Sequence, residues 1–414
     1  MKDVTLLLCG AGDRGRNHGQ NAANHAENAR VVGVAEPREF YRAETAEAHQ
    51  IPAENVFTDW RAMAARDRFA DAVVISTLDH MHVEPAEAFA QKGYHILLEK
   101  PIAPTEADCE RIIAAVKKAG VLFGVCHVLR YTDYNRKIKE IIESGALGDV
   151  VSIQHLEPVT YWHQAHSYVR GNWRNEKESS FMLLAKSCHD IDLIHHFIND
   201  DCTAVSSFGS LKHFRTTEKP NGAADRCLDC SIEATCPYSA KRIYLGRLRQ
   251  GHRGWPVDVV DPDPSEETLT EALRTGPYGR CVYSCDNDVV DNQVVNMSFA
   301  GGQTASFTMT AFTDSSGRQT RIFGTRGQLI GDSQVIKVYD FLTDATTTTD
   351  TRAGSGDITG GHGGGDYHLM RRFVEAVRHD DQSRLLSGAD ETLASHRIVF
   401  AAERARLTNQ VVTL

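Results

Sequence analysis

A glycine motif follows directly after the first apolar run of the chain. Gly10, Gly12 and Gly15 fit the pattern G-x-G-x-x-G, after Leu6–Cys9 and at the start of a helix-like segment. The first glycine of such a motif permits a tight turn, the second lets a pyrophosphate approach the backbone, and the third lets helix and strand pack closely. The helix start supplies free N–H groups and a positive dipole end. We therefore predict a dinucleotide site formed by Gly10, Gly12, Asp13, Arg14 and Gly15.

One carboxylate indicates which dinucleotide this site prefers. Glu36 lies about 20 residues after the glycine motif, at the end of the second predicted strand. A carboxylate there accepts hydrogen bonds from the adenosine ribose hydroxyls and repels a 2′-phosphate, so we expect NAD. Arg38 and Arg42 lie nearby and leave NADP as the alternative.

A lysine stands where ligands of such sheets bind. Lys100 follows Leu97, Leu98 and Glu99 at the carboxyl end of another predicted strand. A lysine in this position can donate to a substrate hydroxyl, and desolvation lowers the pKa of an amine so that it accepts protons near neutral pH. The alternative is a surface lysine ahead of Pro101.

Residues 161–174 concentrate aromatic, imidazole and guanidinium groups in a segment that otherwise reads as a loop. Aromatic faces stack on sugar rings, and arginine binds carboxylates, phosphates or sulfonates through two parallel hydrogen bonds. We expect this segment to bind a carbohydrate, neutral or anionic, and the alternative is an ordinary interdomain loop. The glycine-rich segment His362–Asp366 could close over the same cleft. The candidate substrate residues are Tyr161, His163, His166 and Arg170.

Five of the ten cysteines fall in one region of the chain. Cys227, Cys230 and Cys236 are followed by Cys281 and Cys285. Thiolates at such spacing can hold zinc tetrahedrally and stabilise an irregular segment. We assign a structural zinc site, remote from the catalytic centre, to Cys227, Cys230, Cys236 and Cys285. An iron–sulfur cluster and free thiols are the alternatives.

The elements that must position these residues alternate between strands and helices over about the first 130 residues. Strands separated by helices indicate βαβ units, a parallel sheet and a doubly wound Rossmann fold. The predicted strands are Val4–Cys9, Arg30–Ala35, Ala72–Ser76, Tyr94–Leu98 and Leu122–Cys126, and the predicted helices are Arg14–Asn28, Arg38–His49, Val83–Lys92 and Glu106–Ala119.

The second part of the chain has a different pattern. Hairpin-like spacing over residues 289–340 favours an open, mostly antiparallel sheet. We expect a Rossmann domain at 1–128 and an α/β domain for substrate binding and oligomerisation at 129–414, with a cysteine-bearing insertion at 212–285. The other predicted elements are helices over Tyr134–Ser144, Phe181–Ile198, Tyr367–Arg378 and Gly388–Thr408 and a strand over Val150–His155.

Bulk properties exclude several classes of protein. The chain has 414 residues and a net charge of -10, which argues against binding nucleic acid. No apolar run reaches the roughly 20 residues of a membrane helix. The apolar N-terminal run is short and reads as a buried strand rather than a signal peptide, so we expect a cytoplasmic protein without disulfides.

Several segments together resemble the Gfo/Idh/MocA oxidoreductases. The glycine motif and Glu99-Lys100-Pro101 match, and the C-terminal half matches more loosely through Gly324–Gly327 and the closing helices. The other matching segments are Ser76–His82, Glu140–Gly148 and Cys188–Leu193. The resemblance implies a Rossmann domain, a second α/β domain whose open sheet mediates dimers or tetramers, and oxidation of a sugar or cyclitol hydroxyl or the reverse reduction.

The resemblance also implies roles for individual residues. Lys100 would polarise the reacting oxygen and His189 would relay or accept the proton. Thr77, Leu78 and His82 would lie along the cofactor, with Glu99 beside them, and Trp173 and Arg174 would approach the nicotinamide end.

The chain departs from the family pattern beside His189. Many members have aspartate four residues before the histidine, but this chain has Ala185, followed by Lys186. Two amines near one site depress each other's pKa, so Lys186 is a further catalytic or anion-binding candidate. Leu78-Asp79 likewise replaces a common Pro-Asn pair.

We therefore predict an NAD-dependent sugar oxidoreductase, assembled as a homo-oligomer. The rival is an NAD-dependent glycoside hydrolase, in which transient oxidation, elimination and hydration require a further base such as Tyr161, His163 or Lys186. A third alternative is a Rossmann protein that senses the NAD/NADH ratio without catalysis.

Overall fold

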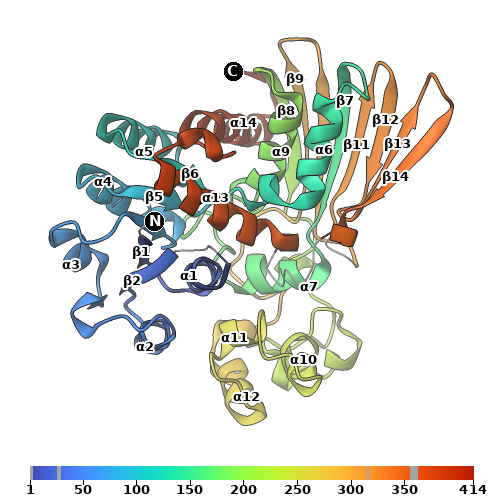
Figure 1. Ribbon diagram of the computed structural model, residues 1–414. Coiled ribbons are helices and arrows are strands. Elements are labelled where there is room, and N and C mark those ends of the chain that lie inside the picture. The colour runs from blue at the N-terminus through green and yellow to red at the C-terminus, as the bar shows by residue number, and fades with distance from the viewer. Residues whose placement is uncertain (1–2, 26–28, 315–316, 355–361) are drawn as a thin grey trace.

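The computed structural model describes residues 3–25, 29–314, 317–354 and 362–414, and it contains two sheets joined by helices (Figure 1). The first sheet has six parallel strands in the order β3-β2-β1-β4-β5-β6. Order reverses between β1 and β4, which is where doubly wound sheets bind ligands. The strands are β1 (Val4–Cys9), β2 (Ala29–Ala35), β3 (Val56–Phe57), β4 (Ala72–Ile75), β5 (His95–Leu98) and β6 (Phe123–Val125).

Helices cover both faces of this sheet, so its strands are nearly continuous apolar runs. This confirms the predicted Rossmann fold, although the short β3 and α3 were not predicted. The helices of this part are α1 (Asp13–His25), α2 (Glu39–Ala48), α3 (Trp60–Ala65), α4 (Val83–Gln91) and α5 (Glu106–Ala119).

A helix from the C-terminal part completes the first domain. The side chains of Leu369 and Phe373 on α13 (Gly365–His379) are buried in the same core as Leu6 and Leu8 of β1. The predicted boundary at residue 128 therefore separates the two sheets but not their cores. Periodicity could not show this packing, because it says which helix face is apolar and not which sheet receives it.

The second sheet has nine strands in the order β14-β13-β12-β11-β7-β10-β9-β8-β15. Neighbours run antiparallel except β7 and β10, which are parallel, so the sheet is mixed and mostly antiparallel. The strands are β7 (Val150–Pro158), β8 (Cys202–Ser210), β9 (Asn292–Phe299), β10 (Thr304–Thr310), β11 (Gln319–Gly324), β12 (Gly327–Gly331), β13 (Val335–Asp340), β14 (Ala345–Asp350) and β15 (Val412–Thr413).

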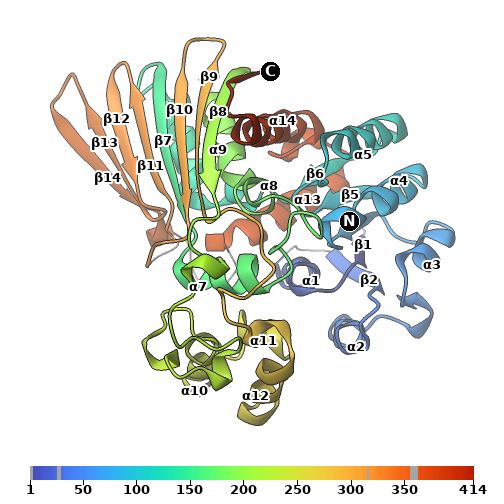
Figure 2. The ribbon, with the colours of Figure 1, turned by 180° about the vertical axis from the view of Figure 1, so that it is seen from behind.

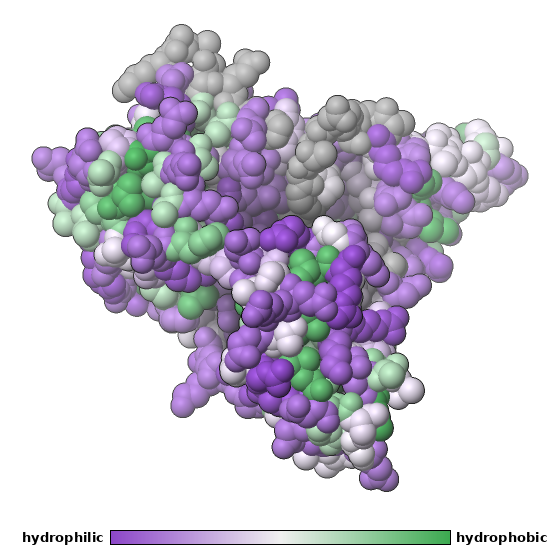
Figure 3. Space-filling view, turned by 90° about the horizontal axis from the view of Figure 1, so that it is seen from below, coloured by the Kyte–Doolittle hydropathy of each residue, from purple (hydrophilic) through white to green (hydrophobic). Residues whose placement is uncertain are grey.

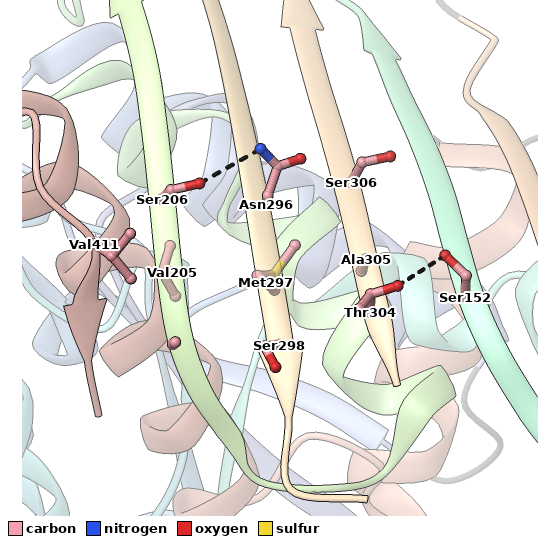
Figure 4. Close-up of a pocket in the computed structure, with 11 residues that line it drawn as sticks. Ser152, Val205, Ser206, Asn296, Met297, Ser298, Thr304, Ala305, Ser306 and Val411 are labelled. Carbon is pink, nitrogen blue, oxygen red and sulfur yellow. Dashed lines mark hydrogen bonds between the residues drawn. The ribbon is translucent and has the colours of Figure 1, made fainter. Parts of the chain in front are cut away.

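Helices pack on one side of this sheet, namely α6 (Asp133–Glu143), α9 (Cys188–Ile198) and α14 (Ala389–Thr408) (Figures 1 and 2). The other side is an open face with short polar side chains. On it Asn296 donates to Ser206 and Thr304 donates to Ser152 around a shallow hollow (Figure 4).

The helix predicted over Phe181–Ile198 is broken in two. The segment α8 (Met182–Ala185) ends at Lys186, and α9 begins after Ser187, a residue type common at helix starts. The carbonyl of Ser187 accepts from the amides of Asp190 and Ile191. Because a helix end leaves carbonyl groups without intrahelical donors, the carbonyl of Ala185 is available to another partner.

The insertion between β8 and β9 folds around a core of its own, which includes Phe214, Tyr244 and Leu273. It contains the helices α10 (Gly246–Arg249), α11 (Val257–Val260) and α12 (Glu266–Thr275), and α7 (Tyr161–His163) lies against it. Seen from the side of the insertion, the surface is mostly hydrophilic with small hydrophobic patches (Figure 3).

The insertion reaches α1, the helix that begins within the glycine motif. In both ribbon views α11 lies just below α1 (Figures 1 and 2). The half-buried carboxyl of Asp258 on α11 interacts electrostatically with Asp13 and Arg16 of α1. Among the described residues, no helix is both long enough and apolar enough to cross a membrane.

Candidate active site

The glycine turn has the shape that its sequence predicts. Gly10 has a φ of 92°, and a Cβ there would lie 2.6 Å from the carbonyl oxygen of Ser76. A Cβ on Gly15 would overlap the carbonyl of Gly10. A Cβ on Gly12 would meet only the end of the Arg38 side chain, at 3.3 Å. Backbone amides are thus open to a phosphate at Gly12, and this geometry fits a bound dinucleotide.

Glu36 stands beside this turn, at the end of β2. Its carboxylate accepts from the amide of Ala11 at 2.8 Å and from the guanidinium of Arg38 at 2.7 Å. Although burial opposes ionisation, these hydrogen bonds lower the pKa of Glu36. The group is therefore an ionised acceptor in the place where an NAD ribose requires one.

Arg14 and Glu99, which the sequence analysis assigns to the cofactor site, pair with each other in a network of charged side chains. The guanidinium of Arg14 lies 2.8 Å from Glu99 Oε1 and also pairs with Asp366. His18 Nε2 lies 2.7 Å from the same Glu99 oxygen, and the other oxygen accepts from the amide of Lys100 at 3.0 Å. Burial opposes ionisation, but Arg14 and His18 hold the pKa of Glu99 well below its usual range. The network links α1 to α13 and fixes the backbone at Lys100.

The side chain of Lys100 extends from the Rossmann domain to the second domain. Its Nζ donates to the carbonyl oxygen of Ala185 at 2.7 Å, which is the carbonyl left available by the break between α8 and α9. The contact lies four residues before His189. The ammonium group of Lys100 therefore reaches the second domain at the segment that precedes His189.

Lys186, the residue after that carbonyl, belongs to a buried chain of charges. Its Nζ lies 3.3 Å from Glu157 Oε1, and Arg318 bridges Glu157 Oε2 at 2.7 Å and Asp190 Oδ1 at 2.6 Å. Burial, with the charges of Arg318 and Lys100, lowers the pKa of Lys186 despite the pairing with Glu157. Sequence reasoning missed Glu157 and Arg318, which become neighbours only through the sheet pairing of β7 and β11.

His189 lies on α9 between two anchored aspartates. Asp190 binds Arg318 and His155, and Asp192 binds the guanidinium of Arg130 at 2.6 Å. The ring of His189 packs edge-on against that of His127, with 5.5 Å between the ring centres. The two aspartates therefore hold the first turn of α9, and with it the position of the histidine.

The segment 77–82 forms one wall of the interdomain cleft. Both ring nitrogens of His82 lie near main-chain carbonyls, 3.0 Å from that of Pro101 and 3.2 Å from that of Thr77, so this buried ring braces the segment. Leu78 is 51% exposed. Asp79 is buried and accepts from the indole of Trp173, and burial raises the pKa of its carboxyl.

Trp173 and Arg174 lie opposite that segment, in a cavity of about 140 Å³ that Asp79 also lines. Arg174 pairs with Asp286 at 3.0 Å and with Glu178 at 3.0 Å. The guanidinium of Arg174 is therefore already paired with carboxylates. The indole of Trp173 instead contacts Asp79, beside the predicted path of the cofactor.

The predicted substrate segment divides into two parts. Burial and the nearby charge of Lys186 hold the pKa of His163 well below its usual range, so this ring is neutral beside the cations. Tyr168, which the sequence analysis did not select, is buried near Glu157 and Asp79, and burial raises the pKa of its hydroxyl. Tyr161 is half-buried, with its ring 6.3 Å from that of Tyr238.

His166 and Arg170 turn away from this group into the insertion. His166 Nδ1 lies 2.9 Å from the Tyr244 hydroxyl and its ring stacks on Tyr278. Arg170 is 1% exposed and donates to the carbonyls of Arg280 and Tyr238. Their expected role in substrate binding is corrected accordingly: both side chains are occupied in the core of the insertion.

The predicted zinc ligands are not gathered as a tetrahedral site requires. Among the residues that the structure describes, the one set of three ligand groups within 4.8 Å of one another is His18, Glu99 and Cys126, where Arg14 already neutralises the carboxylate. The thiol of Cys285, our fourth predicted ligand, donates instead to the carbonyl of Cys281 at 3.2 Å.

Two family models match the chain. The model of the oxidoreductase family NAD-binding Rossmann fold covers residues 4–127, and that of the oxidoreductase family C-terminal alpha/beta domain covers residues 139–414. The chain belongs to the Gfo/Idh/MocA oxidoreductase family. The resemblance noted from its motifs is thereby confirmed, and so is an NAD-binding fold in the first domain.

Some of the similar proteins have names connected with sugars. YteT of Bacillus subtilis, an oxidoreductase by name, is 24% identical over 343 residues, which is 77% of this chain and 76% of YteT. The 2,7-anhydro-N-acetylneuraminate hydratase of Escherichia coli is 27% identical over 168 residues, 37% of this chain and 44% of that protein. A solved levoglucosan dehydrogenase, in complex with NADH and levoglucosan, shares the fold with a TM-score of 0.72 at 20% identity, over 100% of this chain and 99% of that one.

Proposed function

We propose that this protein is an NAD-dependent oxidoreductase that transfers a hydride between the cofactor and a hydroxyl-bearing carbon of a sugar or sugar derivative. The observation that carries the proposal is the contact of Lys100 Nζ with the Ala185 carbonyl, which places the ammonium group at the domain interface just ahead of His189. Names of relatives that act on inositol and anhydro sugars support the substrate class.

The chain's own residues divide the work between binding and proton transfer. Gly10, Gly12 and Gly15 would hold the pyrophosphate and Glu36 the adenosine ribose, and the bound nicotinamide would accept or donate the hydride. Lys100 would donate to the reacting oxygen, and His189 would take its proton during oxidation. General acid–base assistance of this kind contributes roughly 10²–10⁴-fold.

The charge pattern beside Lys100 bears on the substrate. Lys186 and Arg318 share Glu157, and His163 contributes a neutral imidazole on the same side. A sugar hydroxyl or carboxylate can pair with Lys186 by displacing part of its weak 3.3 Å contact with Glu157. We therefore keep neutral and anionic sugars in the substrate class.

The test is turnover with a panel of aldoses, cyclitols, uronic acids and anhydro sugars, in both directions. We expect at least one compound to reduce NAD or one carbonyl derivative to oxidise NADH, and this turnover to disappear in Lys100→Met. Binding of NAD without turnover of any compound, combined with a signalling partner that responds to NADH, would support the sensor alternative instead.

One observation favours a second activity, NAD-dependent glycoside hydrolysis. The site holds more proton-transfer groups than dehydrogenation needs, because Lys186 interacts electrostatically with Lys100 and pairs with Glu157, and Tyr168 is buried near Glu157. Oxidation at one sugar carbon acidifies the neighbouring C–H, so a further base can remove that proton while the leaving group departs from the next carbon. Water then adds, and the hydride returns.

Isotope exchange separates the two activities. A hydrolase or hydratase releases its leaving group without accumulating NADH and, in D2O, incorporates deuterium at the carbon next to the oxidised one. A simple dehydrogenase accumulates NADH and leaves that position undeuterated. Glu157→Gln should abolish the exchange but leave the affinity for NAD unchanged.

A further inference from the structure

Two cysteine-bearing segments of the insertion are brought side by side by main-chain pairing. Arg226 and Arg280 form an isolated antiparallel bridge, and the amide of Cys281 donates to the carbonyl of Asp225 at 2.8 Å. Cys227 and Cys281, 54 positions apart in the chain (281 − 227), therefore belong to neighbouring strands of backbone.

A cavity of about 160 Å³ lies at this junction. Four thiol-bearing residues line it, one from the second segment and three from the first, namely Cys281, Cys227, Cys230 and Cys236. Cys285 is absent from the lining of this described cavity, and its thiol donates to the Cys281 carbonyl. The cysteines that line the cavity thus differ from the ligand set expected from sequence, with Cys281 in place of Cys285.

The wall of the cavity also contains a buried cation without an acidic partner. Arg170 is 1% exposed, and among the described residues it donates to uncharged groups, namely the carbonyls of Arg280 and Tyr238, the thiol of Cys227, 3.5 Å away, and the hydroxyl of Tyr244. The Nη1 atom of Arg170 has no partner in that part of the chain. A buried guanidinium without a counterion costs several kcal/mol, so the site calls for negative charge.

We propose that Cys227, Cys230, Cys236 and Cys281 bind one zinc ion, with Arg170 as the buried counterion of the metal–thiolate group. Each thiol gives its proton to solvent on binding, and four thiolates around Zn²⁺ have a net charge of −2. That charge would compensate Arg170, for which the described part of the chain provides no carboxylate partner. The thiols have to rotate into the cavity, because no three of them lie within 4.8 Å of one another in this structure.

A bound metal would stabilise a part of the insertion that has little regular secondary structure. Around the cysteines the chain forms only short 3₁₀ turns, at Cys227–Asp229 and Glu233–Thr235, so few main-chain hydrogen bonds hold the two segments together. A metal bound by both segments couples its binding free energy to their folding. The site is structural, and it lies apart from Lys100 and His189.

Metal analysis of the reduced full-length protein, expressed with added zinc, tests this proposal. Wild type and the matched control Cys285→Ser should each hold about one zinc per chain. Cys281→Ser should lose most of it, together with thermal stability. Equal zinc in Cys281→Ser and wild type would overturn the ligand set.

Cobalt substitution of the wild-type protein provides a measurement that does not depend on how variants fold. After removal of zinc by a chelator, Co²⁺ should give the absorption of tetrahedral thiolate coordination. Absence of this spectrum, detection of iron with inorganic sulfide, or fewer than ten titratable thiols in the unreduced unfolded chain would each overturn the proposal.

Arg170→Gln tests the role of the counterion. Groups next to metal ligands typically change metal affinity by 10–100-fold, so we expect a loss of roughly tenfold or more in competition with a chelator. An exposed arginine of the same insertion, Arg249, provides the control as Arg249→Gln. Unchanged zinc affinity in Arg170→Gln would mean that the guanidinium does not interact with the metal.

Discussion

At the residue scale, the ammonium group of Lys100 has a main-chain carbonyl as its partner, that of Ala185. The carbonyl of Ala185 is a neutral acceptor, so this contact adds no opposite charge beside the ammonium group of Lys100. The positive charge of Lys100 can then pair with a substrate oxygen as it gains negative charge during oxidation. The nearby Glu157 is held by Lys186 and Arg318.

We predict that Lys100→Met and His189→Ala each lower kcat by about 10²–10⁴-fold, because each removes a proton-transfer or charge-stabilising group. The dissociation constant of NADH, measured by fluorescence, should change little. Lys118→Met, on the exposed face of α5, is the control. A kcat within a factor of about two of wild type in either variant would exclude that residue from the chemistry.

We propose that Glu36 determines the preference between NAD and NADP. In Glu36→Ala, Arg38 loses its carboxylate partner and becomes available to a 2′-phosphate. Hydrogen bonds to charged groups are worth about 1.5–3 kcal/mol, so the ratio of kcat/KM for NADP over NAD should rise roughly tenfold to a hundredfold. Steady-state kinetics with both cofactors measures this ratio, and an unchanged ratio would contradict the assignment of Glu36 to the ribose.

At the element scale, we predict that two glycine-to-alanine substitutions in the glycine turn have different effects on stability and on NAD binding. Gly15→Ala should destabilise the fold, because the new Cβ overlaps the Gly10 carbonyl. Gly12→Ala should leave stability nearly unchanged, because only the movable Arg38 side chain is near, yet it should weaken NAD binding. Denaturant unfolding and calorimetric titration separate the two effects, and equal stability losses would refute this reading of the turn.

The start of α9 depends on an ionised aspartate. Burial opposes ionisation, but Arg318 and His155 lower the pKa of Asp190 from 3.8 to about 2. The stability that this group contributes is therefore present above about pH 4 and is lost as the pH falls toward 2. Unfolding of Asp190→Asn compared with wild type should show a difference at pH 6 that shrinks at pH 3. A difference that is independent of pH would contradict the ion pair.

The elements that the sequence revealed are those whose structure is local. The βαβ order, the glycine turn and α5 follow from periodicity and turn chemistry, and the structure confirms them. The parallel pairing of β7 with β10, the packing of α13 on the first sheet and the meeting of Arg318 with Glu157 depend on contacts between distant segments. Tyr168 lay inside a segment selected for its aromatic residues, and only its burial distinguishes it.

At the scale of the whole molecule, the open face of the second sheet predicts association. Phe208 and Val294, on the strands that also present Ser206 and Asn296, are 57% and 40% exposed, and Ile330 on β12 is 39% exposed. We expect a homo-oligomer formed through this face, so Phe208→Asp combined with Val294→Asp should reduce the mass measured by light scattering to that of one chain. The control is Leu407→Asp on α14, and an unchanged mass would place the interface elsewhere.

The contact between α11 and α1 has a consequence for how the protein exchanges its coenzyme. Because Asp258 of the insertion interacts with Asp13 and Arg16 at the start of the nucleotide-binding helix, a dinucleotide in this groove has protein on two sides. We therefore expect the insertion to slow the departure of a bound dinucleotide. An enzyme that returns the hydride to the sugar within each catalytic cycle can then keep one coenzyme molecule bound through many cycles.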